Sequence, residues 1–424
     1  MKKLLLLITI FTLNTHQSNS QWIQQTVPVS KPITGIKFID SLKGWACTNR
    51  GTPADTGYIL YTSNGGTNWL VQLAAYNINF TDINILNSLT GYVSGADNNI
   101  GLYKLFSTSN GGINWTSVTM VPNMNIADMQ FLNKDSAWEC GNSVGPDVRT
   151  TTDGGNTWIV RTSGLTQATQ KVFFLNYNTG YCAAMTRLYK TTDAGVSWLL
   201  LNVFPTLIQS INFLNYDTAW IGLSGDTSSK VGYTTNGGIN WAIQSLLPYI
   251  LNITDILAVN NQIVYACIPT GLGKIYKTTN AGLNWGYQNV PSGSNKISFV
   301  DSLKGWSGNI GISYTINGGG PIIYVGINNI SSEMPNSFKL YQNYPNPFNP
   351  VTNIKYQISN NRSVVKLIVY DITGREIIKL VDQEQTAGTY KVDFTGSGLS
   401  SGIYFYTLVA DGKIINTKKM ILMK

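Results

Sequence analysis

The sequence predicts an all-β protein in which a seven-bladed β-propeller is followed by a small C-terminal Ig-like β-sandwich. Three observations lead to this prediction. Only 12% of the 424 residues are charged and 41 are glycine, a composition that suits turn-rich β structure better than long helices. An octapeptide ending in tryptophan recurs through the middle of the chain. The C-terminal stretch alternates apolar and polar residues between glycine turns.

Residues 1–20 are expected to be a signal peptide. Two lysines, Lys2 and Lys3, precede an apolar run over residues 4–13, and a short polar stretch ends at Ser20. This order is typical of a secretory signal, with cleavage expected before Gln21. The apolar run is shorter than the roughly 20 residues that span a bilayer, and no later run is long enough, so no transmembrane segment is expected.

Six octapeptides with the pattern Thr-x-(Asn/Asp)-x-Gly-x-x-Trp fill the region that we predict to be the propeller. They occupy residues 62–69, 108–115, 151–158, 191–198, 234–241 and 278–285. A degenerate seventh copy, Thr315–Gly319, lacks the tryptophan. Each copy is preceded by a triplet whose first and third residues are apolar, which we call the apolar triplet, and then by an aromatic residue. This pattern defines seven units of four short strands. A repeat of about 40 to 45 residues with four strands is typical of propeller blades.

Each part of the octapeptide has a structural reason. The third residue can accept hydrogen bonds from the turn, the glycine supplies a positive φ, and the tryptophan buries a large surface between sheets. We therefore assign structural roles to Asn64, Trp69, Asn110, Trp115, Asp153, Trp158, Asp193, Trp198, Asn236, Trp241, Asn280 and Trp285. The pattern resembles the Asp-box (BNR) repeat of sialidases, sortilins and photosystem II assembly-factor propellers. The resemblance covers residues 21–327, the predicted propeller.

The N-terminus of the mature chain is expected to close the ring. The seventh unit lacks its last strand, and residues 21–25 (Gln-Trp-Ile-Gln-Gln) resemble the strands that begin at Trp69 and Trp241. We therefore predict that this N-terminal segment supplies the outer strand of the seventh blade.

Residues 328–337 are expected to form a linker, and residues 338–424 the β-sandwich. The motif from Tyr344 to Pro350 (Tyr-Pro-Asn-Pro-Phe-Asn-Pro), the turn that ends at Arg375 and a basic last strand occur in order. Together they resemble the type A C-terminal sorting domain of the type IX secretion system. The resemblance implies contact of residues 338–424 with the secretion machinery. It also implies Bacteroidota-like export, with the protein secreted or attached to the outer cell surface.

Charge and histidine content exclude several functions. The net charge of +8 comes mostly from the C-terminal segment, while residues 21–337 hold 16 basic and 15 acidic side chains. We therefore expect no nucleic-acid partner. The one histidine, His16, falls in the predicted signal peptide, which removes histidine-based catalysis and histidine metal ligands from the mature chain. No metal site and no cofactor are expected. The four cysteines are expected to be free, packed thiols.

The predicted function is a non-catalytic scaffold that binds an extracellular protein or a glycan. No catalytic residue is assigned. Candidate ligand-binding residues lie in loops on the face opposite the octapeptides: Arg50, Asp97, Arg187, Asp226 and Tyr249. The alternative is a surface glycoside hydrolase that uses a pair of aspartates, because Asp-box propellers include glycosidases and such enzymes need two carboxyl groups. A third possibility is an assembly factor, which the near-neutral propeller disfavours.

Overall fold

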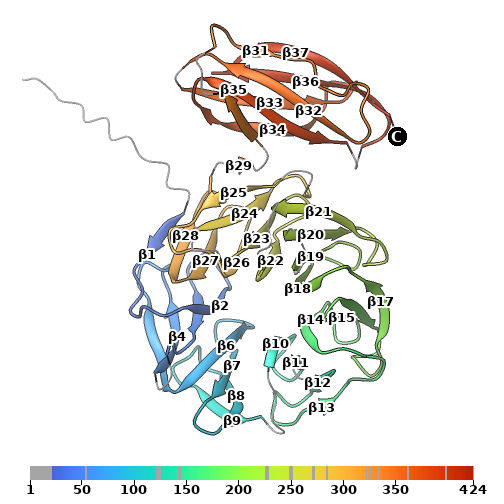
Figure 1. The fold of residues 1–424 in the computed structure, drawn as a ribbon. Coiled ribbons are helices and arrows are strands. Elements are labelled where there is room, and N and C mark those ends of the chain that lie inside the picture. Colours follow the sequence, from blue (N-terminus) through green and yellow to red (C-terminus); the bar gives the residue numbers. More distant parts are fainter. Residues whose placement is uncertain are drawn as a thin grey trace, which may run out of the picture.

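The computed structural model describes residues 22–423 apart from 53–54, 121–125, 142–144, 225–228, 248–251, 270–272, 283–284, 321, 325–326, 332–334, 361 and 397–398. The predicted signal peptide therefore lies outside the described residues. The described chain forms nine antiparallel sheets, and none of its residues lies in a helix. Seven sheets are arranged in a ring and two form a sandwich beside it (Figure 1). The predicted fold class is confirmed.

Blades 1 to 6 each start with an innermost strand and continue outward in chain order (Figure 1). Blades 1 to 3 contain β2 (Ile33–Phe38), β3 (Gly44–Thr48), β4 (Thr56–Thr62), β5 (Leu70–Tyr76), β6 (Ile78–Ile85), β7 (Gly91–Asp97), β8 (Leu102–Thr108), β9 (Thr116–Thr119), β10 (Ile126–Phe131), β11 (Ala137–Gly141), β12 (Val148–Thr151) and β13 (Ile159–Val160). Blades 4 to 6 contain β14 (Thr169–Phe174), β15 (Gly180–Ala184), β16 (Arg187–Thr191), β17 (Leu199–Val203), β18 (Leu207–Phe213), β19 (Ala219–Ser224), β20 (Ser229–Thr234), β21 (Ala242–Leu247), β22 (Asp255–Ala258), β23 (Val264–Cys267), β24 (Lys274–Thr278) and β25 (Gly286–Asn289).

Blade 7 combines strands from the two ends of the propeller. Its strands are β26 (Lys296–Phe299), β27 (Gly305–Asn309), β28 (Gly311–Thr315) and β1 (Ile23–Gln25). Strand β1 pairs antiparallel with β28 and places Ile23 opposite Tyr314. Because β2 also contacts β26, the first and seventh blades are neighbours and the ring is closed. The predicted role of the N-terminal strand is confirmed.

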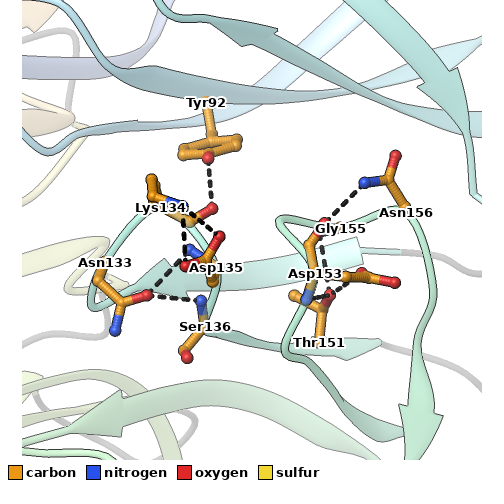
Figure 2. Close-up of polar contacts among 9 residues, drawn as sticks. All are labelled: Tyr92, Asn133, Lys134, Asp135, Ser136, Thr151, Asp153, Gly155 and Asn156. Atoms are coloured by element: carbon orange, nitrogen blue, oxygen red, sulfur yellow. Dashed lines mark hydrogen bonds and ion pairs between the residues drawn. The ribbon is translucent and has the colours of Figure 1, made fainter.

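Figure 2 shows the octapeptide of blade 3 next to the turn between that blade's first two strands. The Thr151 hydroxyl donates to Asp153 Oδ1 at 2.7 Å and accepts from the Gly155 N–H at 2.9 Å. Hydrogen bonds from the side chain and backbone of Thr157 lower the pKa of Asp153 to about 2. The Gly154 N–H reaches across to the Asp135 carbonyl oxygen at 2.9 Å. The octapeptide turn thus satisfies its own polar groups and is anchored to its blade.

Aromatic stacking joins neighbouring blades. A tryptophan or tyrosine from the second strand of one blade stacks on a phenylalanine from the first strand of the next, with ring centroids 3.6 to 4.3 Å apart. The pairs are Trp306–Phe38, Tyr92–Phe131, Trp138–Phe174, Tyr181–Phe213 and Tyr265–Phe299. Such pairs contribute about 0.5–1.5 kcal/mol each beyond the area they bury. They explain the aromatic residue at this point in five of the seven repeats, while Trp45 and Trp220 pack on Tyr61 and Tyr233 of their own blades.

The four cysteines, Cys47, Cys140, Cys182 and Cys267, are buried and free, as predicted. They lie on the second strands of blades 1, 3, 4 and 6. Burial raises the pKa of the Cys47 thiol to about 12, so this sulfur is held as a neutral packing group.

The C-terminal sandwich packs two four-stranded sheets around one core. One sheet has the order β30 (Ile327–Ser331), β35 (Gly388–Thr395), β32 (Val351–Ile358) and β31 (Lys339–Leu340). The other has the order β34 (Glu376–Gln385), β33 (Ser363–Tyr370), β36 (Gly402–Ala410) and β37 (Lys413–Leu422). Inward side chains such as Tyr356, Leu367 and Tyr406 are fully buried.

The segment between propeller and sandwich contains two strands that the sequence did not predict. Strand β29 (Ile323–Tyr324) pairs with β25 as a fifth strand of blade 6. Strand β30 pairs with β35 and so places residues 327–331 in the sandwich, although 328–337 was expected to be a linker. Both strands form at sheet edges, where free backbone groups are available to pair with a further segment.

Candidate ligand-binding site

The predicted ligand-binding residues that the structure describes lie in separate blades. Arg50 follows β3 and its guanidinium donates to the Asn77 side-chain oxygen. Arg187 begins β16 and donates to the Thr166 hydroxyl at 2.5 Å. Among the described residues, no hydrogen bond or ion pair links these arginines to each other. Their role in ligand binding therefore stays a prediction. Two further candidates, Asp226 and Tyr249, lie outside the described residues.

Asp97 is engaged within its own hairpin. It ends β7, is 4% exposed and forms an ion pair with Lys104 at 2.6 Å. Burial alone would raise the pKa of Asp97, but hydrogen bonds from Lys104 and Asn99 lower it overall. The carboxylate that we expected to face a ligand thus holds the loop between β7 and β8. Its role in ligand binding has no support from this geometry and stays a prediction.

The octapeptide residues form the same contacts around the ring. In each copy the threonine hydroxyl donates to the Asn or Asp at the third position. The tryptophan indoles of three copies donate to glutamines of the preceding blade: Trp69 to Gln25, Trp115 to Gln72 and Trp285 to Gln244. These bonds support the structural roles assigned from the sequence.

The innermost strands carry a group of charges that the sequence analysis missed. We call it the central charge cluster: Asp82 on β6, Asp128 on β10, Lys171 on β14, Asp255 on β22 and Lys296 on β26. Each residue directly precedes the apolar triplet of its repeat. The repeat alignment could have revealed the cluster, because this one position carries five charged residues in seven units.

The central charge cluster ties neighbouring blades together. Asp128 bonds the Lys171 ammonium group at 2.8 Å and accepts the Val172 N–H at 3.0 Å. Asp255 accepts the Ile297 N–H of the next blade at 3.1 Å. These two carboxylates therefore accept hydrogen bonds that link adjacent inner strands, and both residues are partly exposed.

Electrostatic coupling spans the centre of the ring. Burial and the neighbouring Asp128 carboxylate raise the pKa of Asp82 to about 6. Burial opposes the charge on Lys171, yet the carboxylates of Asp128, Asp82 and Asp255 raise its pKa overall. Opposite charges thus compensate one another where the dielectric is low. Among the described residues, no group of three or more His, Cys, Asp or Glu side chains could hold a metal ion.

A pocket of about 470 Å³ lies at the seam between blades 7 and 1, on the face of the octapeptide turns. We call it the seam pocket. Its walls come from β1, from the turn between β2 and β3, from the first octapeptide, from β27 with the turn before it, and from the end of β28. It is lined by Gln24, Gln25, Thr26, Ser41, Leu42, Asn64, Gly65, Gly66, Thr67, Lys304, Trp306, Tyr314, Thr315 and Ile316.

The seam pocket is lined by polar, aromatic and apolar groups. Gln24 and Asn64 supply exposed amides, Tyr314 supplies a half-buried aromatic ring, and Lys304 supplies the only charge. The lining contains no aspartate or glutamate. The pocket can therefore bond hydroxyl, amide or carboxylate groups of a ligand, but it holds no pair of carboxyl groups for glycoside hydrolysis.

Sequence comparison identifies the class of the C-terminal part. Residues 342–423 match the family described as Secretion system C-terminal sorting domain. This match shows that the protein is exported by the type IX secretion system, to the cell surface or into the medium, as is typical of Bacteroidota. No curated protein matches the chain in sequence. The described residues include no helix that is long and apolar enough to cross a membrane.

Solved structures resemble the chain in fold. The structure of YCF48 bound to D1 peptide has a TM-score of 0.56 and 18% identity, covering 70% of this chain and 97% of that chain. YCF48 from Cyanidioschyzon merolae has a TM-score of 0.55 and 17% identity, covering 69% and 98%. The GH74 xyloglucanase of Xanthomonas campestris has a TM-score of 0.56 and 11% identity, covering 93% and 68%. At these identities the likeness shows the propeller fold alone.

Proposed function

We propose that this protein is a non-catalytic binding scaffold of the cell surface or the medium, whose ligand is a glycan or a protein held at the seam pocket. The observation that carries the proposal is the lining of that pocket. It combines amides, hydroxyls, an aromatic ring and one ammonium group, and it lacks any carboxylate. Concave sites with a few convergent polar groups on an apolar base are typical of ligand recognition.

The positions of the acidic residues support binding over hydrolysis. Hydrolysis of a glycosidic bond needs two carboxyl groups about 5–9.5 Å apart across an open site. The described aspartates are mostly held in octapeptide turns, in the turns between strands, in ion pairs or in the central charge cluster. Glu139 is fully buried. These contacts support a structural role for the carboxyl groups that make them.

The fold itself is compatible with both functions. A GH74 xyloglucanase and a peptide-bound YCF48 have the same architecture, so the contents of the site must decide between them. The lining of the seam pocket, and not the resemblance to these two structures, therefore supports the proposal.

The proposal is tested by a glycan array and a peptide array probed with the mature full-length chain. Lys304→Ala and Gln24→Ala remove exposed pocket groups and are expected to reduce the bound signal about tenfold. Lys43→Ala is the matched control, because residues 40–45 and 301–306 are the same hexapeptide (Asp-Ser-Leu-Lys-Gly-Trp) and Lys43 lies outside the pocket lining. Equal loss of signal in Lys43→Ala, or no loss in the pocket variants, would reject the seam pocket as the site.

A further inference from the structure

The outer face of one sandwich sheet carries three lysines without carboxylate partners. Lys339 lies on β31, Lys355 on β32 and Lys391 on β35. Their neighbours along the strands, among them Ile354, Tyr356 and Val392, are buried in the core, so the lysines point away from it. Among the described residues, no aspartate or glutamate forms an ion pair with any of the three.

The register places two of these charges directly opposite each other. Lys355 on β32 pairs with Lys391 on β35. Like charges at opposite positions of an antiparallel pair destabilise a sheet. The repulsion between Lys355 and Lys391 therefore destabilises the sandwich. A contribution to stability does not explain why two lysines occupy these positions.

A tyrosine holds two of the lysines in place. The ammonium groups of Lys339 and Lys355 lie 4.9 and 5.1 Å from the centroid of the Tyr341 ring. Each contact is of the cation–π kind, worth about 0.5–1 kcal/mol at an exposed site. The Tyr341 ring thus holds the two ammonium groups close together. It also restricts the two lysine side chains, so that a binding partner would lose less conformational entropy in ordering them.

The opposite sheet shows a different charge pattern. There Lys366 lies 3.7 Å from Asp382, and Lys379 lies 3.9 Å from Glu376 and 3.6 Å from Asp382. The acidic residues of the sandwich that form ion pairs do so on this sheet or in its loops. That sheet also carries Lys413, Lys418 and Lys419 on β37, so positive charge is present on both sheets. What distinguishes the face of Lys339, Lys355 and Lys391, which we call the basic face, is a pair of lysines directly opposite each other.

We propose that the basic face is the surface by which this sorting domain docks on an acidic protein face of the export machinery. The domain identity implies contact with that machinery, and the opposed lysines Lys355 and Lys391, which sheet stability does not explain, point to this face. A protein partner is favoured over an anionic membrane because the carboxylate of Asp393 is on the same face, opposite Asn353, and would be repelled by a uniformly negative surface.

The test compares matched pairs of lysines in the full-length chain, expressed in a bacterium with an active type IX system. Lys355→Gln/Lys391→Gln removes two charges from the basic face, and Lys366→Gln/Lys379→Gln removes two from the other sheet. We expect export of the first variant to fall about tenfold, which corresponds to about 1.4 kcal/mol of binding. The second variant and Lys355→Arg/Lys391→Arg should be exported like the parent. The melting temperature of Lys355→Gln/Lys391→Gln should be equal or higher, which separates docking from misfolding.

Three results would overturn the proposal. They are unchanged export of Lys355→Gln/Lys391→Gln, an equal loss in Lys366→Gln/Lys379→Gln, and a loss in the arginine variant. A fourth comes from vesicles of phosphatidylglycerol: lysine-dependent binding of the purified chain to them would assign the basic face to a lipid surface instead. Failure of the seam pocket as a ligand site would leave this proposal unaffected, because the two surfaces share no residue.

Discussion

Trp22 donates its indole N–H to the side-chain oxygen of Gln288, 266 residues later in the chain, at a distance of 3.1 Å. Trp69 makes the same bond to Gln25 at 3.0 Å, and there the tryptophan belongs to an octapeptide. Trp22 is therefore the tryptophan that the seventh octapeptide lacks, supplied from the N-terminal strand. The ring is closed by a side-chain contact as well as by the backbone pairing of β1 with β28.

Removal of Trp22 should destabilise the whole propeller. The side chain is 1% exposed, and truncation of a buried tryptophan costs about 3–5 kcal/mol. Trp22→Ala should therefore lower the melting temperature strongly, and deletion of residues 21–30 should lower it further. Ile23→Ala is the matched control, because Ile23 is 42% exposed on the same strand. Equal melting curves for Trp22→Ala and the parent would contradict closure at this point.

Glu139 should make stability depend on pH. Burial, with a smaller contribution from Asp147, raises the pKa of Glu139 from 4.5 to about 8, and neither carboxyl oxygen has a hydrogen-bond partner among the described residues. Between about pH 4.5 and about pH 8 the Glu139 carboxyl group is ionised in the unfolded chain and protonated in the folded chain. The contribution of Glu139 to the free energy of unfolding therefore decreases as pH rises from about 4.5 to about 8.

Glu139→Gln keeps this side chain neutral at every pH and should remove that part of the slope. The free energy of unfolding of parent and variant is measured by urea unfolding at about pH 5 and about pH 8. The variant should be more stable than the parent at about pH 8 only. A parent and variant with the same pH slope would show that Glu139 does not hold its proton in the folded protein.

The fourth octapeptide contains a strained alanine. Ala194 has a φ of 62°, while the equivalent Gly154 of blade 3 has a φ of 72°. A left-handed conformation costs a residue with a Cβ roughly 1–2 kcal/mol, part of which is offset by the larger entropy of an unfolded glycine. Ala194→Gly should raise the free energy of unfolding by about 0.5–1 kcal/mol, and Gly154→Ala should lower it. Calorimetry of both variants measures these changes in stability. A lower stability of Ala194→Gly than of the parent would contradict the prediction.

Much of the propeller could be predicted because its determinants are local and repeated. The threonine-to-asparagine turns, the tryptophan at each eighth position and the aromatic pairs recur within one unit, so a single chain reveals them. Closure was also predictable, since residues 22–25 repeat the pattern Trp-x-x-Gln of residues 69–72.

The features that were missed depend on contacts between units. The position of Asp82 occurs once in every blade, but the residue type there changes from blade to blade. The seven residues are Gly35, Asp82, Asp128, Lys171, Ser210, Asp255 and Lys296. The seam pocket needs Gln24 and Tyr314 on neighbouring strands far apart in sequence. Strand β30 forms in a stretch rich in Asn and Ser because the edge at β35 is available. Strand β29 lies in the run Ile322-Ile323-Tyr324, whose residue types favour a strand but do not indicate which sheet it joins.

The central claim, that this exported ring binds without reacting, is tested most directly by a turnover assay. The mature chain is incubated with a panel of chromogenic glycosides and with the polysaccharide fragments that it retains on the array. We expect retention without release of product, and loss of retention in Lys304→Ala. Product that accumulates with time and with protein concentration, and that disappears in Asp82→Asn or Asp97→Asn variants that still melt like the parent, would show a glycoside hydrolase and contradict the account.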